Sequence, residues 1–273
     1  MRSSCVAHLP QTSLVDRSEI LRELGLLPLW RLRAPTPASP REDSVPPTVA
    51  PVARPTQELP ASASDRLRRI ATLEWRDFAR DVDACTACGL CKTRNKSVPG
   101  VGDAQAQWLF VGEAPGAEED AKGEPFVGQA GRLLDNMLAA LGMKRGTNVY
   151  IANVLKCRPP GNRTPEPSEA ESCRPYLDRQ IELIKPSLIV ALGKSAATTL
   201  LNVEATIASL RGRVHRYRGV PLLVTYHPAY LLRNLPDKAK AWEDLCLARA
   251  TLRRLQAGSD PALPLQVAGT GPI

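Results

Sequence analysis

The sequence predicts an α/β fold in which a short, mainly parallel four-stranded sheet is covered by helices on both faces. Four short apolar runs have the length and composition of buried strands, at residues 107–111, 148–155, 187–192 and 221–225. Segments with the apolar spacing of helices lie between these runs. Glycine-rich or proline-rich segments follow three of them. Because strands that alternate with helices form parallel sheets, ligands are expected at the carboxyl ends of these strands.

The N-terminal region contains one short segment with order-promoting sequence. Residues 16–33, DRSEILRELGLLPLWRLR, place Ile20, Leu21 and Leu24 on one helical face and end in the apolar run LLPLW. We expect residues 1–34 to form a peptide that docks on a partner. The alternative is a helix that packs back on the folded domain.

The rest of the chain divides into a linker, one folded domain and a tail. Eight of the 25 prolines lie within residues 35–60, so residues 35–64 are predicted to form a disordered, proline-rich linker. The folded domain is expected at residues 65–257 and a disordered tail at residues 258–273. Seven arginines balance seven acidic residues up to position 65, so the net charge of +8 arises beyond it. A basic folded domain favours a polyanionic partner such as nucleic acid.

The chain lacks the patterns of secretion and of membrane insertion. The first residues, MRSSCVAHLPQTSL, have no continuous apolar core, and no apolar run is long enough to cross a bilayer. We therefore predict a cytoplasmic protein. Its seven cysteines are then expected to be reduced, which directs attention to metal ligation rather than disulfides.

The helices are predicted from apolar spacing and from capping residues. Leu67, Ile70, Leu73 and Phe78 have the spacing of one helix that runs towards Cys85. The other predicted elements are helices at residues 132–141, 168–184 with Ser168 as N-cap, 194–201 and 238–255, and a basic hairpin-like segment at residues 211–220.

The run VGEAPGAEEDAKGEPFVGQAG, residues 111–131, joins the first strand to the next helix. It contains five glycines, four carboxylates before Pro125 in addition to Asp120, and the single aromatic residue Phe126. Backbone amides and helix N-termini converge at such strand ends. We interpret the run as an active-site loop. The alternative is a solvated connection, in which a lone Phe between Pro and Gly would be costly.

Four cysteines have the spacing of a metal centre. Cys85 and Cys88 form a C-x2-C pair, and Cys157 and Cys173 flank the proline-rich loop KCRPPGNRTPEP. Zinc ribbons usually bring two close pairs, so the wide separation of the second pair favours an iron-sulfur cluster with four thiolate ligands. Cys91 extends the motif to C-x2-C-x2-C. It is either a competing ligand or an ordinary free thiol.

Polar side chains follow the predicted strands closely or lie in the loops that the strands enter. Because the carboxyl ends of parallel strands meet at one edge, a single crevice could collect them. Individually, the histidine before a proline could be a turn residue and the asparagine a strand-end cap. These residues are Glu113, Glu119, Asn153, Asn162 and His227.

Together these motifs resemble a known family. GEAPGAEED, GEPFVGQAG, ANVLKCRPPGNRTP, the cysteine spacing and HPAYLLRN occur in order over about residues 66–257 and are similar to the thermostable-type, family 4 uracil-DNA glycosylases. The resemblance implies the three-layer α/β/α uracil-DNA glycosylase fold. It also implies a structural 4Fe-4S cluster on Cys85, Cys88, Cys157 and Cys173.

The resemblance further implies how uracil is recognised. A base must leave the DNA stack before its glycosidic bond can be reached. Phe126 would stack on the flipped uracil, and Asn153 would bind its O4 and N3 edge and reject cytosine, whose donor and acceptor pattern is reversed. His227 would donate to O2 and stabilise the uracil anion as the bond to C1′ breaks.

The water-positioning group is less closely defined by the resemblance. Glu119, supported by Asn162, is the family's candidate, and Glu113 shapes the same loop. Better-known uracil-DNA glycosylases have an Asp at the position of Ala114. The choice of carboxylate that positions the water is therefore open.

The remaining substrate contacts are implied for residues that would hold the flipped nucleotide and its phosphates through amides and charge. These are Gly112, Gly128, Ser195 and Arg233. Four arginines of the hairpin-like segment would add a basic rim or would form a solvated ribbon: Arg211, Arg213, Arg216 and Arg218.

Residues 16–33 have a second resemblance. They are similar to the N-terminal peptide of the psi subunit of the bacterial DNA polymerase III clamp loader, a subunit whose fold is related to uracil-DNA glycosylases. The resemblance implies docking on the clamp loader, with Leu24, Leu27 and Trp30 as anchors.

These patterns predict a monomeric base-excision enzyme that acts on uracil-containing DNA. One alternative is a catalytically silent, nucleic-acid-binding or replication-scaffold protein with the same fold, and another is a redox protein. A scaffold has no need for the combined pocket residues Phe126, Asn153, Asn162 and His227. The family variant that traps DNA covalently has a basic insertion after the Phe loop. GQAGRLLDNM has no such insertion, so turnover is expected.

Overall fold

A computed structural model of the chain describes residues 61–258, with side chains from Ser64 onward. The predicted partner-docking peptide, the linker up to residue 60 and the tail beyond residue 258 lie outside these residues. Within them, the first helix begins at Ala61, four residues before the predicted start of the folded domain.

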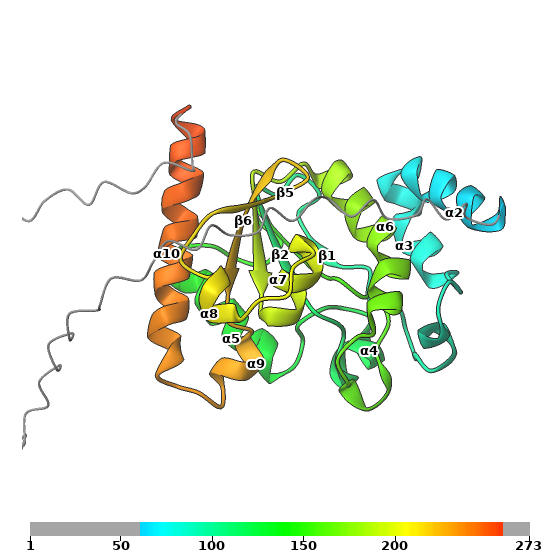
Figure 1. The fold of residues 1–273 in the computed structure, drawn as a ribbon, viewed down its shortest axis with the longest axis horizontal. Helices are drawn as coiled ribbons and strands as arrows, with labels where there is room; N and C mark the ends of the chain where they lie inside the picture. Colours follow the sequence, from blue (N-terminus) through cyan, green and yellow to red (C-terminus); the bar gives the residue numbers. More distant parts are fainter. Residues whose placement is uncertain (1–60, 259–273) are drawn as a thin grey trace, which may run out of the picture. The chain divides into compact units, whose positions relative to one another are not determined.

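A six-stranded sheet with the order β1-β3-β2-β4-β6-β5 forms the centre of the domain (Figure 1). The four inner strands are parallel, and both edge strands are antiparallel to their neighbours. The strands are β1 (Val101–Gly102), β2 (Trp108–Gly112), β3 (Val149–Asn153), β4 (Leu188–Leu192), β5 (His215–Tyr217) and β6 (Val220–Thr225). The predicted α/β fold and the four inner strands are confirmed. The number of strands was wrong, because two-residue and three-residue edge strands are too short to show a period.

The inner strands are buried on both faces, which explains their continuous apolar sequences. Every residue of β2, β3 and β4 is buried. In the register of the sheet, Gly112 at the end of β2 lies beside Asn153 at the end of β3. The carboxyl ends of the predicted strands therefore do meet at one edge.

Helices cover both faces of the sheet, as the sequence predicted. One face packs against α6 and α7, and the opposite face packs against α5 and α10. The helices are α2 (Ala61–Ala71), α3 (Trp75–Asp83), α4 (Ala117–Lys122), α5 (Gln129–Ala140), α6 (Pro167–Ile184), α7 (Lys194–Leu201), α8 (Ile207–Leu210), α9 (Pro228–Leu231) and α10 (Asp237–Gln256), with the 3-10 turns η1 (Gly89–Lys92) and η2 (Pro160–Asn162).

Three details of the predicted helices were wrong. Helix α5 begins at Gln129, three residues before the predicted start at residue 132. The single helix expected to run towards Cys85 is divided into α2 and α3, and Leu73 is buried in the break between them. Helix α6 begins after Glu166 rather than after Ser168, because Pro167 is suited to the first helical position. The backbone N–H of Glu166 donates to the carboxylate of Glu169, at 2.9 Å.

The start of α5 contacts the active-site loop so closely that only glycine fits. A Cβ atom on Gly131 would lie 1.7 Å from the carbonyl oxygen of Phe126. The backbone of Phe126 would have to move to make room for a methyl group at position 131. The glycine therefore allows helix α5 to lie directly against the residue predicted to stack on the base.

Gly131→Ala is expected to lower the free energy of unfolding by about 1–3 kcal/mol, the usual cost of inserting a methyl group into packed structure. Asn136→Ala is the matched control, since this exposed site on the same helix also gains helix propensity. Chemical denaturation of both variants measures the difference. Equal or higher stability of Gly131→Ala would show that the loop yields without cost.

Candidate active site

Four of the predicted site residues meet at the carboxyl edge of the sheet. The rings of Phe126 and His227 lie 5.5 Å apart between centroids. A Cβ atom on Gly112 would lie 2.4 Å from Oδ1 of Asn153 and 2.7 Å from Cζ of Phe126. A Cβ atom on Gly193 would lie 2.9 Å from Cβ of His227. The two glycines thus leave room for the three side chains to converge.

Asn153 presents an unpaired acceptor inside this site. Its side chain is 1% exposed, and Oδ1 has no hydrogen-bond partner among the described residues. Buried polar atoms are nearly always paired, because an unpaired acceptor costs roughly 1–3 kcal/mol. An acceptor of this kind at the end of a strand is suited to bind a donor of a ligand.

Phe126 is buried and has a left-handed backbone conformation, with φ 55°. A non-glycine residue rarely adopts this conformation unless its surroundings hold it there. Arg145 supplies part of that support, since its guanidinium donates to the carbonyl oxygens of Pro125 and Phe126, both at 2.9 Å. Arg145 was not predicted from the sequence, because it lies in the turn after α5 and belongs to none of the recognised motifs.

Glu119 organises the loop around Phe126. Its Oε1 accepts the backbone N–H groups of Val127 at 2.9 Å and of Gly128 at 3.2 Å, and its Oε2 accepts that of Gly116 at 3.1 Å. Three backbone amides therefore use most of the acceptor positions of this carboxylate. The amide of Gly128, which was expected to bind phosphate, donates to Glu119 instead.

Asn162 forms its hydrogen bond with a neighbouring residue of its own loop. Its side chain is exposed, and its Oδ1 accepts a hydrogen bond from Nε of Arg158 at 2.7 Å. Within the described chain, Glu119 takes its hydrogen bonds from backbone amides rather than from Asn162. The expected support of Glu119 by Asn162 is not among the hydrogen bonds of the described residues, and it stays a prediction.

Glu113 and Ser195 form a second polar pair at this edge. Burial raises the pKa of the Glu113 carboxyl, and a hydrogen bond from Ser195 partly offsets that effect. A carboxyl with a raised pKa at a strand end is typical of functional sites. Sequence analysis assigned Glu113 to shaping the loop and Ser195 to substrate contact without predicting their pairing.

His227 is held as a neutral imidazole. Burial lowers its pKa to about 4, an effect that the nearby Arg233 reinforces and Glu119 opposes. Its Nδ1 accepts the backbone N–H of Ala229 at 3.1 Å, at the start of α9. A neutral ring whose Nδ1 accepts carries its proton on Nε2. His227 is thus a hydrogen-bond donor at its other nitrogen.

Exposed leucines flank the arginine that follows α9. Leu232 is 41% exposed and Leu235 is 61% exposed, and Arg233 between them is exposed as well. Exposed apolar residues beside a cationic residue are typical of wedges that enter DNA. Arg233 was predicted to contact the substrate, whereas the two leucines were not, although the run LLRNL shows apolar residues on both sides of the arginine.

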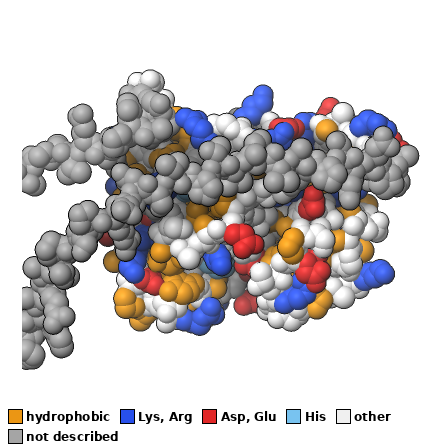
Figure 2. All heavy atoms as spheres, in the orientation of Figure 1, with side chains coloured by type: hydrophobic (Ala, Val, Ile, Leu, Met, Phe, Trp, Pro, Cys, Tyr) orange, Lys and Arg blue, Asp and Glu red, His pale blue; other side chains and the backbone are white. Residues whose placement is uncertain are grey.

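Two of the four arginines of the predicted basic rim form ion pairs with carboxylates of the same domain. Arg211 binds the carboxylate of Asp244 at 2.8 Å, and Arg218 binds Asp178 at 3.0 Å and Glu182 at 3.1 Å. On the uncovered parts of the face in Figure 2, basic and acidic side chains are mixed. These two arginines therefore stabilise the fold around the last hairpin.

The four cysteines predicted as ligands line one pocket, together with Cys91. They come from four parts of the fold. Cys85 follows α3, Cys88 precedes η1, Cys157 lies in the loop after β3, and Cys173 lies on α6. Cations surround the thiols. Arg94 donates to Sγ of Cys157 at 2.9 Å, and Arg66 lies 3.7 Å from Sγ of Cys85.

The donor set of this pocket suits a thiolate-bound iron-sulfur cluster. Burial raises the pKa of the Cys173 thiol to about 12, so a bound metal must displace its proton. Each thiolate of a 4Fe-4S cluster can bind a different iron, so the sulfur atoms need not converge on one point. Accordingly, no three Cys, His, Asp or Glu side chains within residues 61–258 are arranged around a single metal ion. Arg66 and Arg94 supply positive charge that would offset the thiolates.

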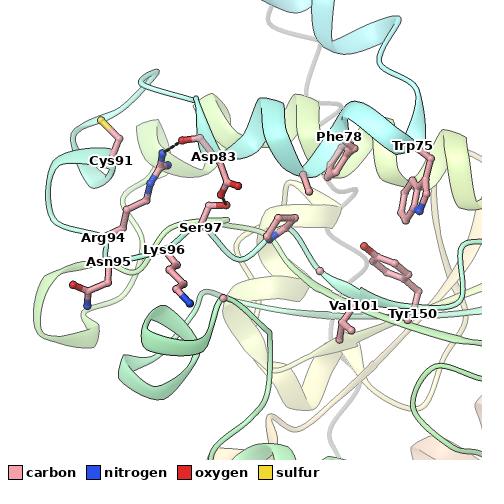
Figure 3. Close-up of a pocket in the computed structure, with 15 residues that line it drawn as sticks. Trp75, Phe78, Asp83, Cys91, Arg94, Asn95, Lys96, Ser97, Val101 and Tyr150 are labelled. Atoms are coloured by element: carbon pink, nitrogen blue, oxygen red, sulfur yellow. Dashed lines mark hydrogen bonds between the residues drawn. The ribbon is translucent and has the colours of Figure 1, made fainter.

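A separate groove of about 980 Å³ is lined in part by residues of the segment 91–102 (Figure 3). Trp75, Tyr150, Arg94 and Lys96 line it, and Cys91 is the residue that it shares with the cysteine pocket. None of the predicted catalytic residues lines this groove. Cavity size therefore does not identify the active site here.

The described helices include none with both the length and the apolar composition that a membrane span requires.

The site and the fold together define an α/β domain with an aromatic and polar site at the carboxyl edge of a parallel sheet. Residues 99–246 match the model of the uracil DNA glycosylase superfamily, so the chain belongs to that superfamily and is a DNA glycosylase.

Within it, the chain belongs to the type-4 uracil-DNA glycosylases. It is 49% identical to the type-4 enzyme of Archaeoglobus fulgidus over 164 residues, which cover 57% of this chain and 82% of the relative. It is 45% identical to that of Pyrobaculum aerophilum, covering 60% and 87%. For that of Thermotoga maritima the identity is 42%, covering 63% and 92%. The family predicted from the motifs is thereby confirmed.

The depressed pKa of His227 makes the stability of the folded state depend on pH. The unfolded chain binds a proton at this residue near its ordinary pKa of 6.5, whereas the folded chain binds it only near pH 4. Between these values the unfolded state holds more protons, so stability falls as pH falls, by at most about 1.4 kcal/mol per pH unit. Denaturation of wild type and His227→Gln from pH 7 to 4 measures this slope. A variant with the same slope as wild type would contradict the neutral, buried ring.

Proposed function

We propose that this chain flips uracil out of DNA and hydrolyses its N-glycosidic bond, with Phe126, Asn153 and His227 as the groups that contact the base. The observation that carries the proposal is the unpaired, buried Oδ1 of Asn153 beside the rings of Phe126 and His227. A flipped base needs an aromatic surface and a hydrogen-bonding edge in one enclosed site.

Asn153 and Phe126 account for the choice of base. The free Oδ1 accepts the N3–H of uracil, and the amide NH2 donates to O4. Cytosine presents an acceptor at N3 and a donor at N4, so both contacts would fail. Gly112 keeps the space between these two side chains free, because any Cβ atom there would overlap both.

His227 stabilises the leaving base. As the bond to C1′ breaks, negative charge develops on uracil and spreads to O2. The Nε2–H of a neutral imidazole donates to that oxygen, and the fixed bond from Ala229 to Nδ1 aims the ring beforehand. The proton stays on His227 throughout, since uracil leaves as the anion.

Glu113 is the better placed carboxylate for the attacking water. Both oxygens of Glu119 are committed to three backbone amides, whereas the hydrogen-bond partner of Glu113 is the Ser195 hydroxyl. We assign Glu119 to shaping the loop and Glu113 to holding the water. Asn162 is then free to contact the DNA from its exposed loop.

The nucleotide around the base meets charge and apolar groups. Arg233 is exposed near His227 and is suited to a phosphate contact. Leu232 and Leu235 beside it can fill the gap that the flipped base leaves in the stack. These contacts concern uracil-containing DNA, and we infer that one chain suffices for them.

Cys85, Cys88, Cys157 and Cys173 would hold a 4Fe-4S cluster. Such a cluster would covalently link segments that are distant in the sequence. The convergence of these cysteines, with Arg66 and Arg94 beside them, supports this assignment. Zinc and ligation by Cys91 are the alternatives.

Two further predictions concern parts or properties that the described residues do not test. Docking on the DNA polymerase III clamp loader through residues 16–33 lies outside them. A cytoplasmic location stays a prediction from the sequence. The rival function, a catalytically silent scaffold on the same fold, would leave the unpaired Asn153 without a purpose.

Asn153→Ala is expected to lower kcat/KM for release of uracil from a labelled oligonucleotide about 5- to 150-fold, since a bidentate base contact provides roughly 1–3 kcal/mol of discrimination. Asn136→Ala, on the surface of α5, serves as the control and should match wild type. Equal release by wild type and Asn153→Ala would refute the base-recognition role. No release by the wild type would favour the scaffold.

The cluster assignment is tested by substituting cysteines one at a time. Cys157→Ser is expected to remove the brown colour, the visible absorption and the protein-bound iron. Cys246→Ser is the matched control, because Cys246 lies on α10 and does not line the cysteine pocket. Loss of iron in Cys91→Ser but not in Cys88→Ser would exchange these two ligands, and zinc in place of iron would reject the cluster.

A further inference from the structure

Helix α4 (Ala117–Lys122) carries Glu119 but has almost no apolar contact with the domain. Among its six residues, Asp120 is the one that is buried, and it is 1% exposed. A six-residue helix is not stable alone, and helices are normally held by the burial of an apolar face. The position of α4 therefore depends on the contacts of a carboxylate.

Asp120 makes a two-point contact with a single residue. Its Oδ1 accepts the backbone N–H of Asn95 at 2.9 Å, and its Oδ2 accepts Nδ2 of the same residue at 2.7 Å. Among the described residues no Lys or Arg forms an ion pair with Asp120. Two bonds between the same pair of residues fix orientation as well as distance. Loss of either would leave a buried charged oxygen unpaired.

Asn95 belongs to a segment that is fastened to the cysteine pocket. Arg94 donates to Sγ of Cys157 at 2.9 Å and also to the carbonyl oxygen of Asp83 (Figure 3). The backbone N–H of Val98 donates to the carbonyl oxygen of Lys156 at 2.7 Å. The segment from residue 94 to residue 98 is thus attached on both sides of Asn95. It forms a rigid support between the pocket and α4.

Glu119, the residue before Asp120 on α4, contacts a different part of the chain. Successive residues of a helix point about 100° apart, so Asp120 contacts Asn95 while Glu119 contacts the loop around Phe126. A shift of α4 at Asp120 would therefore displace the acceptor of the Val127 and Gly128 amides.

We propose that Asn95 and Asp120 are positioning residues that couple the cysteine pocket to the active-site loop. The pair holds α4, and α4 holds Phe126 in place through Glu119. The proposal rests on the proposed function, uracil excision, for its kinetic consequence only. A merely structural pair would lower stability without changing the turnover of the folded enzyme.

The first test is the kinetics of Asn95→Ala on a uracil-containing oligonucleotide, with the cluster-loaded full chain. The side chain of Asn95 is exposed, apart from this contact, so the variant is expected to fold. We expect kcat to fall by about 10- to 100-fold, the effect of a small misplacement of a reacting group. Affinity for the undamaged oligonucleotide and absorbance of the cluster should not change. The exchanged pair Asn95→Asp with Asp120→Asn keeps complementary donors and acceptors and should restore most of kcat.

Asp103→Asn is the matched control, because it alters a similar contact at the opposite end of the strands. The carboxylate of Asp103 accepts the backbone N–H groups of Asn148 at 3.0 Å and of Gln105 at 2.9 Å. It should lower stability and leave kcat unchanged. A wild-type kcat in Asn95→Ala, or an equal loss in Asp103→Asn, would overturn the coupling.

Amide hydrogen exchange provides a readout that does not depend on activity. In Asn95→Ala, exchange at Val127 and Gly128 should become faster, because their acceptor Glu119 moves, while exchange at Phe110 in β2 should not. Unchanged exchange at both loop amides would refute the coupling. If the wild type released no uracil, the proposed function would fail, and the exchange measurement would still decide the coupling.

Discussion

The carboxylate of Glu119 determines the shape of the active-site loop, because its two oxygens accept amide hydrogens from both ends of that loop. Gly116 lies before α4, whereas Val127 and Gly128 lie directly after Phe126. The loop has only the short helix α4 as regular structure, so these bonds largely replace a strand or a long helix. A charged acceptor makes each bond stronger than one between neutral groups. The left-handed backbone of Phe126 is sustained in this way, with Arg145 fixing its carbonyl oxygen from the other side.

The groups proposed to contact the base are uncharged. Asn153 is an amide and His227 is a neutral imidazole, whereas Glu119 is bound to backbone amides. In an enclosed site a fixed dipole stabilises a developing anion without the desolvation cost of a full charge. A protonated His227 would require burial of a cation, which the lowered pKa opposes. The same burial that lowers this pKa therefore selects the donor form that the chemistry needs.

Some parts of this structure could be predicted from the sequence and others could not, for physical reasons. The inner strands are buried on both faces, so their apolar runs are continuous, and motifs at their ends predicted Asn153 and His227, which the structure places near Phe126. The edge strands β1 and β5 contain too few residues to show alternation. The role of Glu119 was hidden because its partners are backbone amides, which every residue other than proline has. Arg145 donates a hydrogen bond to the carbonyl oxygen of Phe126, 19 residues earlier in the chain. Every residue has a backbone carbonyl, so no residue type in the sequence indicates this contact.

The cysteine pocket supports the base-binding site along two routes. One runs from Cys157 through Arg94 and Asn95 to α4. The other is the chain itself, since Cys157 follows Asn153 by four residues, and between them the buried ammonium group of Lys156 donates to the carbonyl oxygen of Asn153 at 2.8 Å. Both routes contain hydrogen bonds that involve charged side chains. Hydrogen bonds to buried charged groups lose most of their energy when moved by a fraction of their length. A tie that fixes Cys157 would thus fix both Asn153, the acceptor proposed to read uracil, and α4, the helix that orders the loop around Phe126.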